Sequence, residues 1–387
     1  RLGIAWSGSL ISLNAPGRPE RLSGFEIVRY TPDHRRQVAE LQKRLWFDDV
    51  ESNLDYLQWK YHENPHADEP LAVLAMAGDR VIGMRGLFGA LIEFGQPAVR
   101  MPIYLAGDLA VAEDWENRGV FPALMDAAMD ELRSRGHSHL LSFGATDKTM
   151  LAQLATGWRA TAPLGQSTRP RRDWSLLLKN WLTARPASRR LARFVPAKRR
   201  PGPFVELIRR PRRGAAAPLT WTDKPRFRDM AALVARLEND GRIRQVRDEP
   251  YLRWRLSNPM HRRFYGYWVE DQLEGYVILE ARRQQLRQVY LLDAEASRPE
   301  ILIAILKHMT GVMRGSTLTA FARCLPGRLG DRLAEFGFVD REPQTALGRA
   351  LPCILARNVG DVAGDTLLHG VDLADLAQWD MRRLYNM

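Results

Sequence analysis

The feature that most constrains the fold of this chain is an internal repeat. Residues 56–60 read Tyr-Leu-Gln-Trp-Lys and return at 251–255 as Tyr-Leu-Arg-Trp-Arg, and an Asn-Pro dipeptide follows each copy. Residues 78–83 and 270–275 form a second matching pair in the same order. The two pairs share a period of about 190 residues, which indicates a duplicated domain. The length of 387 residues agrees, because it exceeds what one core of typical size holds.

Composition shifts and turn residues then divide the chain into four parts. We expect a loose tail at 1–24, a first domain at 25–168, a linker at 169–218 and a second domain at 219–387. In the first domain the predicted order is a strand, two helices, three strands, a long helix, a strand and a short helix. A closing hairpin is expected from Trp158 onward.

The most informative stretch of the first copy is 105–132, where an apolar strand leads through a polar turn into an amphipathic helix. The turn runs from Trp115 to Phe121 and contains Gly119, which lets the backbone come close to a ligand. The first amides of the following helix have no internal partners, so an anion can bind there. The stretch therefore predicts a site for a pyrophosphate.

This stretch resembles motif A of the GNAT superfamily of acyl-CoA N-acyltransferases, whose pattern at the turn is Arg/Gln-x-x-Gly-x-Gly/Ala. Aligned on Gly119, the first position falls on Glu116 and the last on Phe121, and both depart from the pattern. The predicted element order is also the GNAT order. The resemblance implies an α/β (α+β) fold in tandem, with a mixed central sheet flanked by helices in each repeat.

The resemblance also implies a co-substrate, acetyl-CoA or another acyl-CoA, bound where two parallel strands splay apart. In such proteins the strand before the turn offers its backbone to the pantetheine arm, and the turn holds the phosphates. By position these roles fall on Leu109, Ala110 and Val111 for the arm, and on Asn117, Arg118, Gly119, Val120 and Phe121 for the phosphates.

Asp108 is the candidate general base. An acceptor amine must lose a proton before it attacks a thioester, and a carboxylate can take that proton. A charged residue within an apolar strand is costly unless it is paired or functional. Strand alternation, however, places Asp108 on the face opposite Leu109 and Val111 unless a bulge intervenes. No tyrosine lies near 144–150 to serve as the general acid, so the acid stays unassigned.

Tyr56 and Trp59 lie on the helix that lines the acceptor groove in GNAT folds, which makes them candidate substrate contacts. Packing is the alternative, because Tyr251 and Trp254 repeat the pattern in the second copy. That copy carries three carboxylates and no glycine at 292–300, where a phosphate turn belongs. We therefore expect a non-catalytic second copy.

The formal net charge of +12 favours polyanionic partners but does not choose among them. Arginine, lysine and proline dominate 169–213, which also carries tryptophans and leucines. This stretch predicts either a solvated linker or a contact with an anionic membrane surface. No nucleic-acid motif is present, and Pro65 separates His62 from His66, so neither nucleic-acid binding nor a metal site is expected.

These features together predict an N-acetyltransferase that acts on a primary amine, such as that of an amino sugar or a cell-envelope precursor. Two cysteines and no apolar run of about 18 residues predict a cytoplasmic protein, with a possible peripheral place at the inner face of the membrane. Two alternatives stay open. One is a FemX-like transferase that uses aminoacyl-tRNA, and the other is a binding scaffold without activity.

Overall fold

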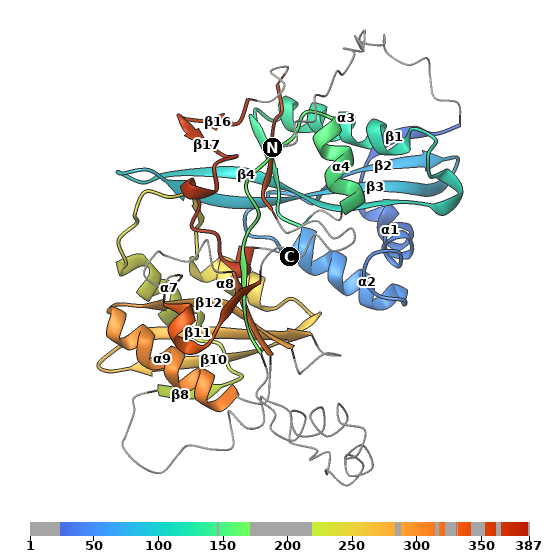
Figure 1. Ribbon diagram of the computed structural model, residues 1–387. Coiled ribbons are helices and arrows are strands. Elements are labelled where there is room, and N and C mark those ends of the chain that lie inside the picture. Colours follow the sequence, from blue (N-terminus) through green and yellow to red (C-terminus); the bar gives the residue numbers. More distant parts are fainter. Residues whose placement is uncertain are drawn as a thin grey trace, which may run out of the picture.

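The computed structural model describes residues 24–144, 147–170, 219–282, 288–313, 317–321, 330, 332–341, 353–360 and 365–385. These residues form two mixed sheets, one in each half of the molecule (Figure 1). Helices flank both sheets, as the sequence predicts. The expected tail and linker lie outside the described residues except at their inner ends, and so does the expected membrane contact.

The first sheet has eight strands. Seven of them follow the spatial order β1 (Glu26–Arg29), β2 (Leu71–Ala77), β3 (Arg80–Phe94), β4 (Val99–Val111), β5 (His139–Ser142), β15 (Leu355–Asn358) and β6 (Arg159–Ala160), while β9 (Arg244–Gln245) pairs with β3. The helices of this half are η1 (Pro32–His34), α1 (Arg35–Gln42), α2 (Val50–Leu57), η2 (Gln58–His62), η3 (Glu113–Trp115), α3 (Val120–Ser134) and α4 (Asp147–Ala155).

The second sheet has seven strands. Their spatial order is β8 (Leu219–Thr222), β10 (His261–Val269), β11 (Leu273–Arg282), β12 (Gln288–Ala296), β13 (Thr317–Phe321), β7 (Gln166–Arg169) and β14 (Val339–Arg341). The helices are α7 (Phe227–Arg236), α8 (Glu249–Leu256), α9 (Pro299–Val312) and η7 (Leu333–Phe336). The chain ends with the hairpin of β16 (Leu367–Leu368) and β17 (Val371–Asp372), followed by η8 (Leu376–Gln378) and η9 (Arg383–Tyr385).

The two sheets exchange one strand. β15, from the end of the chain, lies between β5 and β6 of the first sheet, while β7, from the first half, lies between β13 and β14 of the second. The closing hairpin expected after Trp158 is therefore wrong, because β6 and β7 lie in different sheets. The first predicted domain, 25–168, contributes β7 to the second sheet, and the second, 219–387, contributes β15 and β9 to the first, so the two copies are interlocked.

The repeat at 78–83 and 270–275 marks the same helix contact in both copies. A Cβ atom on Gly83 would lie 2.8 Å from Val120 on α3, and one on Gly275 would lie 2.8 Å from Ile301 on α9. Both glycines let the long helix approach the sheet closely. The repeat therefore fixes α3 and α9 at equivalent positions.

The other repeat joins the two copies. The rings of Trp59 and Trp254 stack with centroids 5.4 Å apart and an interplanar angle of 16°. The indole nitrogen of Trp59 donates to the backbone oxygen of Trp254 at 2.7 Å, and Trp254 returns the same bond at 2.6 Å. Both tryptophans are buried. The contact is symmetric because the two helices that carry it are copies of each other.

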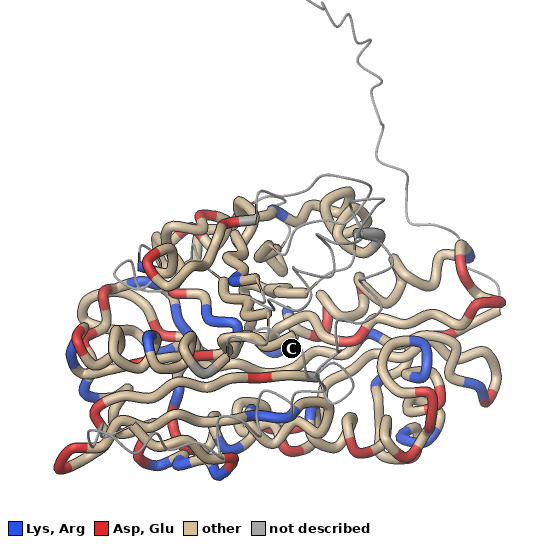
Figure 2. Tube along the Cα trace, turned by 60° about the horizontal axis from the view of Figure 1, so that its bottom comes forward, with Lys and Arg blue, Asp and Glu red and all other residues tan. Residues whose placement is uncertain are grey.

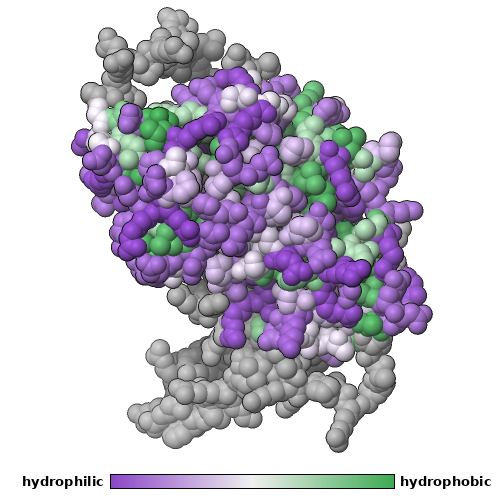
Figure 3. Space-filling model, turned by 180° about the vertical axis from the view of Figure 1, so that it is seen from behind, coloured by the Kyte–Doolittle hydropathy of each residue, from purple (hydrophilic) through white to green (hydrophobic). Residues whose placement is uncertain are grey.

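Charged residues of opposite sign are not segregated along the described chain. Acidic and basic residues are interspersed through both halves (Figure 2). On the face turned away in Figure 1, hydrophobic residues form separate small patches within a mostly hydrophilic surface (Figure 3). Within the part of the chain that the structure describes, no helix combines the length and apolar character that crossing a membrane requires.

Candidate active site

β4 and β5 are parallel strands that separate near their carboxyl ends. They pair only at Tyr104 with Leu140 and at Leu105 with Leu141. β4 continues to Val111, still paired with β3 on its other side, whereas β5 ends at Ser142. In the described residues, no pairing joins the two strands after Leu105. The splay that the resemblance implies is therefore open.

A cavity of about 630 Å³, here called the turn cavity, lies beside this splay. Seven of the eight residues predicted to bind the co-substrate line it: Leu109, Ala110, Val111, Asn117, Gly119, Val120 and Phe121. Phe121 forms part of the wall of this cavity. Arg118 is the exception, because its guanidinium lies over the ring of Trp115, 5.3 Å from the centroid.

The turn before α3 has a backbone shape suited to an anion. Asn117 and Gly119 both adopt left-handed conformations, with φ of 60° and 79°, which asparagine and glycine tolerate best. Gly119 immediately precedes the helix, so the amides of Val120 and Phe121 have no acceptor within it. Pro122 follows and has no amide hydrogen. The first amides of the helix therefore lie at the wall of the turn cavity, at the positive end of the helix dipole.

Arg44 compensates for the glutamate at the first motif position. Its Nη2 lies 2.9 Å from Oε1 of Glu116, and its Nη1 lies 3.6 Å from Glu113. Arg44 follows the end of α1 and lines the turn cavity. The sequence analysis missed this residue, because no pattern connects an arginine after one helix to a turn about 70 residues later. The carboxylate of Glu116 is thus neutralised where phosphates are expected.

A second, smaller cavity of about 140 Å³ adjoins the first and shares Leu45, Leu109 and Thr149 with it. We call it the charged cavity, because Lys60, Arg85 and Asp108 line it. Its other walls are mainly apolar and include Trp46, Phe88 and Phe143, with Tyr385 from η9. The shared residue Leu109 marks the point where the end of β4 passes from one cavity to the other.

Asp108 is a buried carboxylate with two side-chain partners in the charged cavity. Its Oδ1 lies 2.7 Å from Nζ of Lys60, and its Oδ2 accepts a hydrogen bond of 2.7 Å from Nε2 of Gln42. The backbone amide of Asp108 donates to the hydroxyl of Tyr61 at 3.2 Å. Its side chain is 1% exposed. Such an ion pair is stable only because additional hydrogen bonds satisfy it.

A β-bulge explains how Asp108 reaches this cavity together with Leu109. The pairing of β3 with β4 passes from Leu87–Ala106 to Arg85–Leu109, so that two residues of β4 oppose one residue of β3. The bulge interrupts the alternation that would otherwise direct Asp108 and Leu109 to opposite faces. The alternation expected from the sequence allows this placement only with such a bulge.

Tyr56 and Trp59 line neither the turn cavity nor the charged cavity, and their role as acceptor contacts stays a prediction. Trp59 lies in the contact between the two copies. The hydroxyl of Tyr56 lies 3.5 Å from Nζ of Lys60, which lines the charged cavity. Burial, reinforced by the negative charge of Asp108, raises the pKa of Tyr56 well above its usual value, so the phenol stays neutral.

The second copy keeps a cavity at the equivalent place but builds it differently. This cavity, of about 520 Å³, lies beside the end of β12 and the start of α9. β12 also separates from its parallel neighbour β13, since their pairing ends at Tyr290. Only Ser297 and Arg298 connect β12 to α9, and Arg298 has an extended backbone with φ of −135°. The long turn with two left-handed residues has no counterpart here.

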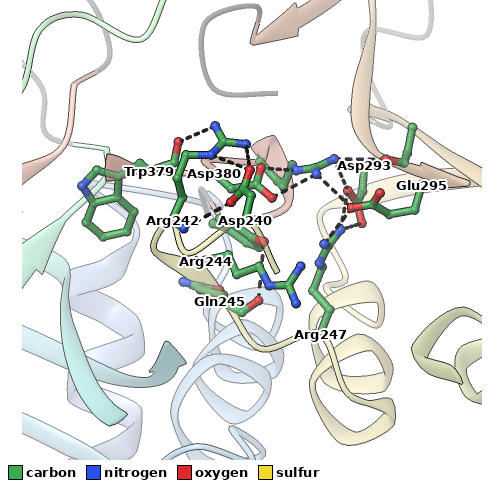
Figure 4. A network of polar contacts seen from close by, with 12 residues as sticks. Asp240, Arg242, Arg244, Gln245, Arg247, Asp293, Glu295, Trp379 and Asp380 are labelled. Carbon is green, nitrogen blue, oxygen red and sulfur yellow. Dashed lines mark hydrogen bonds and ion pairs between the residues drawn. The ribbon is translucent and has the colours of Figure 1, made fainter. Parts of the chain in front are cut away.

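A buried ionic network covers the end of β12 (Figure 4). Arg382 lies 2.8 Å from Glu295 and 2.6 Å from Asp380, and it donates to the backbone oxygen of Ala294 at 3.0 Å. Arg247 pairs with Asp293 at 3.0 Å and with Glu295 at 2.7 Å. The strand register matches Ala294 with Leu109 of the first copy. The backbone expected to receive a pantetheine arm is therefore occupied in the second copy.

The described residues contain no group of three histidine, cysteine, aspartate or glutamate side chains that could hold a metal ion. The polar groups of the site are instead backbone amides, one buried ion pair and two arginines. This set suits binding of anions and movement of a proton. Of these groups, sequence reasoning identified the turn and Asp108, and it missed Gln42, Arg44 and Arg85.

The fold is that of known N-acetyltransferases. A probable N-acyltransferase of unknown function from Enterococcus faecalis V583 matches with a TM-score of 0.56 at 12% identity, over 87% of this chain and 73% of that chain. A GCN5-related N-acetyltransferase from Anabaena variabilis ATCC 29413 matches with a TM-score of 0.52 at 14% identity, with the same coverage. Eis1 from Mycobacterium abscessus matches with a TM-score of 0.50 at 13% identity, over 87% and 73% of the two chains. The sequence itself matches no protein-family model and no curated protein.

Proposed function

We propose that this chain, which has the GNAT N-acetyltransferase fold in tandem, transfers an acyl group, with acetyl as the expected group, from coenzyme A to a primary amine. The observation that carries the proposal is the turn cavity, where the end of β4, the left-handed turn and the first amides of α3 meet beside an open splay. Amino sugars and cell-envelope precursors offer acceptor amines of this kind.

Each part of the turn cavity has a role in this proposal. The amides at the start of α3 and the guanidinium of Arg44 bind the pyrophosphate. The backbone of 109–111 bonds to the pantetheine arm as an added strand would. This arrangement brings the thioester to Leu109, where the turn cavity meets the charged cavity. The acceptor amine then approaches from the charged cavity.

Asp108 is the group placed to take the proton in this proposal. The amine nitrogen forms a bond with the thioester carbonyl carbon, the carbon–sulfur bond breaks, and the nitrogen loses one proton. A carboxylate accepts about four hydrogen bonds in all, so Asp108 retains capacity for the amine alongside Lys60 and Gln42. The leaving thiolate takes its proton from water, since no acidic side chain is assigned to it.

The second copy acts as a brace in this proposal. Arg382 bonds to the backbone near the end of β12, and the turn between β12 and α9 lacks the left-handed residues found before α3. It contributes the strand β13 that pairs with β7, the tryptophan that stacks on Trp59, and Tyr385 in the wall of the charged cavity. The first copy therefore depends on the second for structure, and the transfer takes place once per chain.

Gly119→Glu tests the proposal by placing a carboxylate beside the amides at the start of α3, here called the cradle. Isothermal titration with acetyl-CoA should show binding to the full chain and about a hundredfold loss in the variant, because the new charge repels the pyrophosphate. Gly136→Glu is the matched control: Gly136 has φ of 78° and lies just beyond the other end of α3, so both variants carry the same backbone strain.

Equal losses in the two variants would show that strain, and not the cradle, controls binding. Failure of the unmodified chain to bind acetyl-CoA would overturn the proposal. Binding of aminoacyl-tRNA without any response to acetyl-CoA would instead support the FemX-like alternative. Differential scanning fluorimetry of all three proteins shows whether each one is folded.

A further inference from the structure

Arg85 is a buried cation that has no anionic partner of its own among the described residues. Its side chain, on β3, is 2% exposed and lines the charged cavity. Nη1 donates to the backbone oxygen of Gly107 at 3.2 Å. Among the described residues, Nε and Nη2 have no hydrogen-bond partner. Burial lowers the pKa of Arg85 to about 10, so the group is still protonated at neutral pH.

The described residues that line the charged cavity carry one more positive charge than negative charge. Of the described residues that line it, Lys60 and Arg85 are cationic and Asp108 is anionic. Asp108 is committed to Lys60 at 2.7 Å and to Gln42 at 2.7 Å. A buried ion without a partner costs several kcal/mol, so a protein retains one chiefly where a ligand completes it.

We infer that the charged cavity binds a carboxylate of the substrate through Nε and Nη2 of Arg85, and that the substrate is therefore an acid as well as an amine or a thioester. Nε and one terminal nitrogen form the edge of the guanidinium that holds a carboxylate by two parallel hydrogen bonds. The inference rests on the proposed function for the identity of the reaction, and it adds the chemical class of the substrate.

The size and lining of the charged cavity agree with a small acid. A volume of about 140 Å³ holds roughly four or five waters, which is the space of a carboxylate with a few carbons. Trp46, Phe88 and Phe143 give it apolar walls, which strengthen an interaction between two charges. In an amino acid the amine would then face Asp108, while the carboxylate bonds to Arg85.

The carboxylate has two possible sources, the acceptor or the far end of the acyl chain, and the experiment separates them. For the acceptor, each of the twenty amino acids is compared with its decarboxylated amine at saturating acetyl-CoA, with release of free coenzyme A as the readout. For the donor, the affinity of the full chain for succinyl-CoA is compared with that for butyryl-CoA by titration.

In one of the two arms the carboxylate should improve kcat/KM or affinity by about thirtyfold or more, the usual effect of completing a buried charged pair. Arg85→Met should abolish this preference, and Arg85→Lys should restore part of it. The inference is overturned if the unmodified chain shows no preference in either arm, or if the preference survives in Arg85→Met.

Stability provides a second readout that a structural role for Arg85 would move in the opposite direction. Arg85→Met removes an unpaired buried charge, so its thermal midpoint should be equal to or above that of the unmodified chain. Arg263, also buried but paired with Glu280 at 3.0 Å, is the control, and Arg263→Met should lower the midpoint. A fall in Arg85→Met as large as that in Arg263→Met would contradict the inference.

Failure of the proposed function gives a different result. If the cradle binds no thioester, neither succinyl-CoA nor butyryl-CoA binds, and no coenzyme A is released. The carboxylate site is still tested in that case by thermal shift with propionate, alanine and ethylamine. Propionate and alanine should stabilise the unmodified chain and not Arg85→Met, while ethylamine should have no effect that depends on Arg85.

Discussion

The two copies share one sheet order and one helix contact, yet they end their central strands in opposite ways. In the first copy, β4 ends in a long turn with two left-handed residues, and its last backbone groups line an open cavity. In the second, β12 enters α9 almost directly, and Arg382 bonds to its backbone. The duplicated fold therefore provides a splay in both copies, and the local sequence decides whether an arginine bonds to the backbone at the end of the central strand.

The same contrast holds for the two aspartates at equivalent register. Asp108 pairs with one lysine and borders a cavity. Asp293 is enclosed by Arg247, by Arg382 and by the hydroxyl of Tyr276, which donates to it at 2.7 Å. A carboxylate next to space can exchange a proton with a substrate, whereas a carboxylate inside a network holds segments together.

The largest effect should come from Asp108→Asn. Loss of the general base should lower kcat by about 10²–10⁴ fold, with acetyl-CoA affinity nearly unchanged. Steady-state kinetics and titration measure the two quantities. Because Lys60 would be left unpaired, the double variant Lys60→Met/Asp108→Asn serves as the control for folding; it should regain stability and stay inactive. Full turnover in the double variant would clear Asp108 of this role.

Arg382→Met should produce the largest loss of stability in the second copy. The change leaves Asp293, Glu295 and Asp380 with one cation fewer, and breaking a buried pair in this way costs about 3–5 kcal/mol. Urea unfolding of the full chain measures the loss. Arg298→Met is the matched control from the same cavity wall, since its exposed pair with Glu270 is worth about 1 kcal/mol at most. Similar losses of stability in Arg382→Met and Arg298→Met would contradict the expected difference between the buried network and an exposed ion pair.

A smaller effect should appear in the pH dependence of stability. Burial acts to raise the pKa of Asp380, but Arg382 outweighs it and holds the pKa below its usual value. Ionised Asp380 therefore stabilises the fold above the unfolded-state pKa of about 3.9, and this contribution disappears as the pH falls through the lower folded-state pKa. Free energies of unfolding for the unmodified chain and Asp380→Asn should converge below about pH 4. Parallel curves would show that Asp380 does not titrate in this network.

The sequence predicted the parts of this protein that depend on local patterns. The predicted order of a strand, two helices, three strands, a long helix, a strand and a short helix follows from apolar patterns between turn residues, and it appears in the structure. The turn around Gly119 was recognisable because a left-handed glycine before a helix leaves a local signature. The repeats at 56–60 and 78–83 predicted the duplication, and the structure shows them at the contact between copies and at the helix–sheet contact.

Tertiary structure alone decided the rest. Nothing local indicates that β7 and β15 change places, because a strand of four residues pairs with whichever edge its connections bring near. Arg44 and Arg85 line the two cavities and Gln42 bonds to Asp108, each from a separate element, and an isolated polar residue does not indicate its distant partners. The sequence by itself determined the two copies and the glycine turn before α3. Only long-range packing determined which charges were paired around them, because pairing energies depend on burial and geometry that neighbouring residues in the sequence do not set.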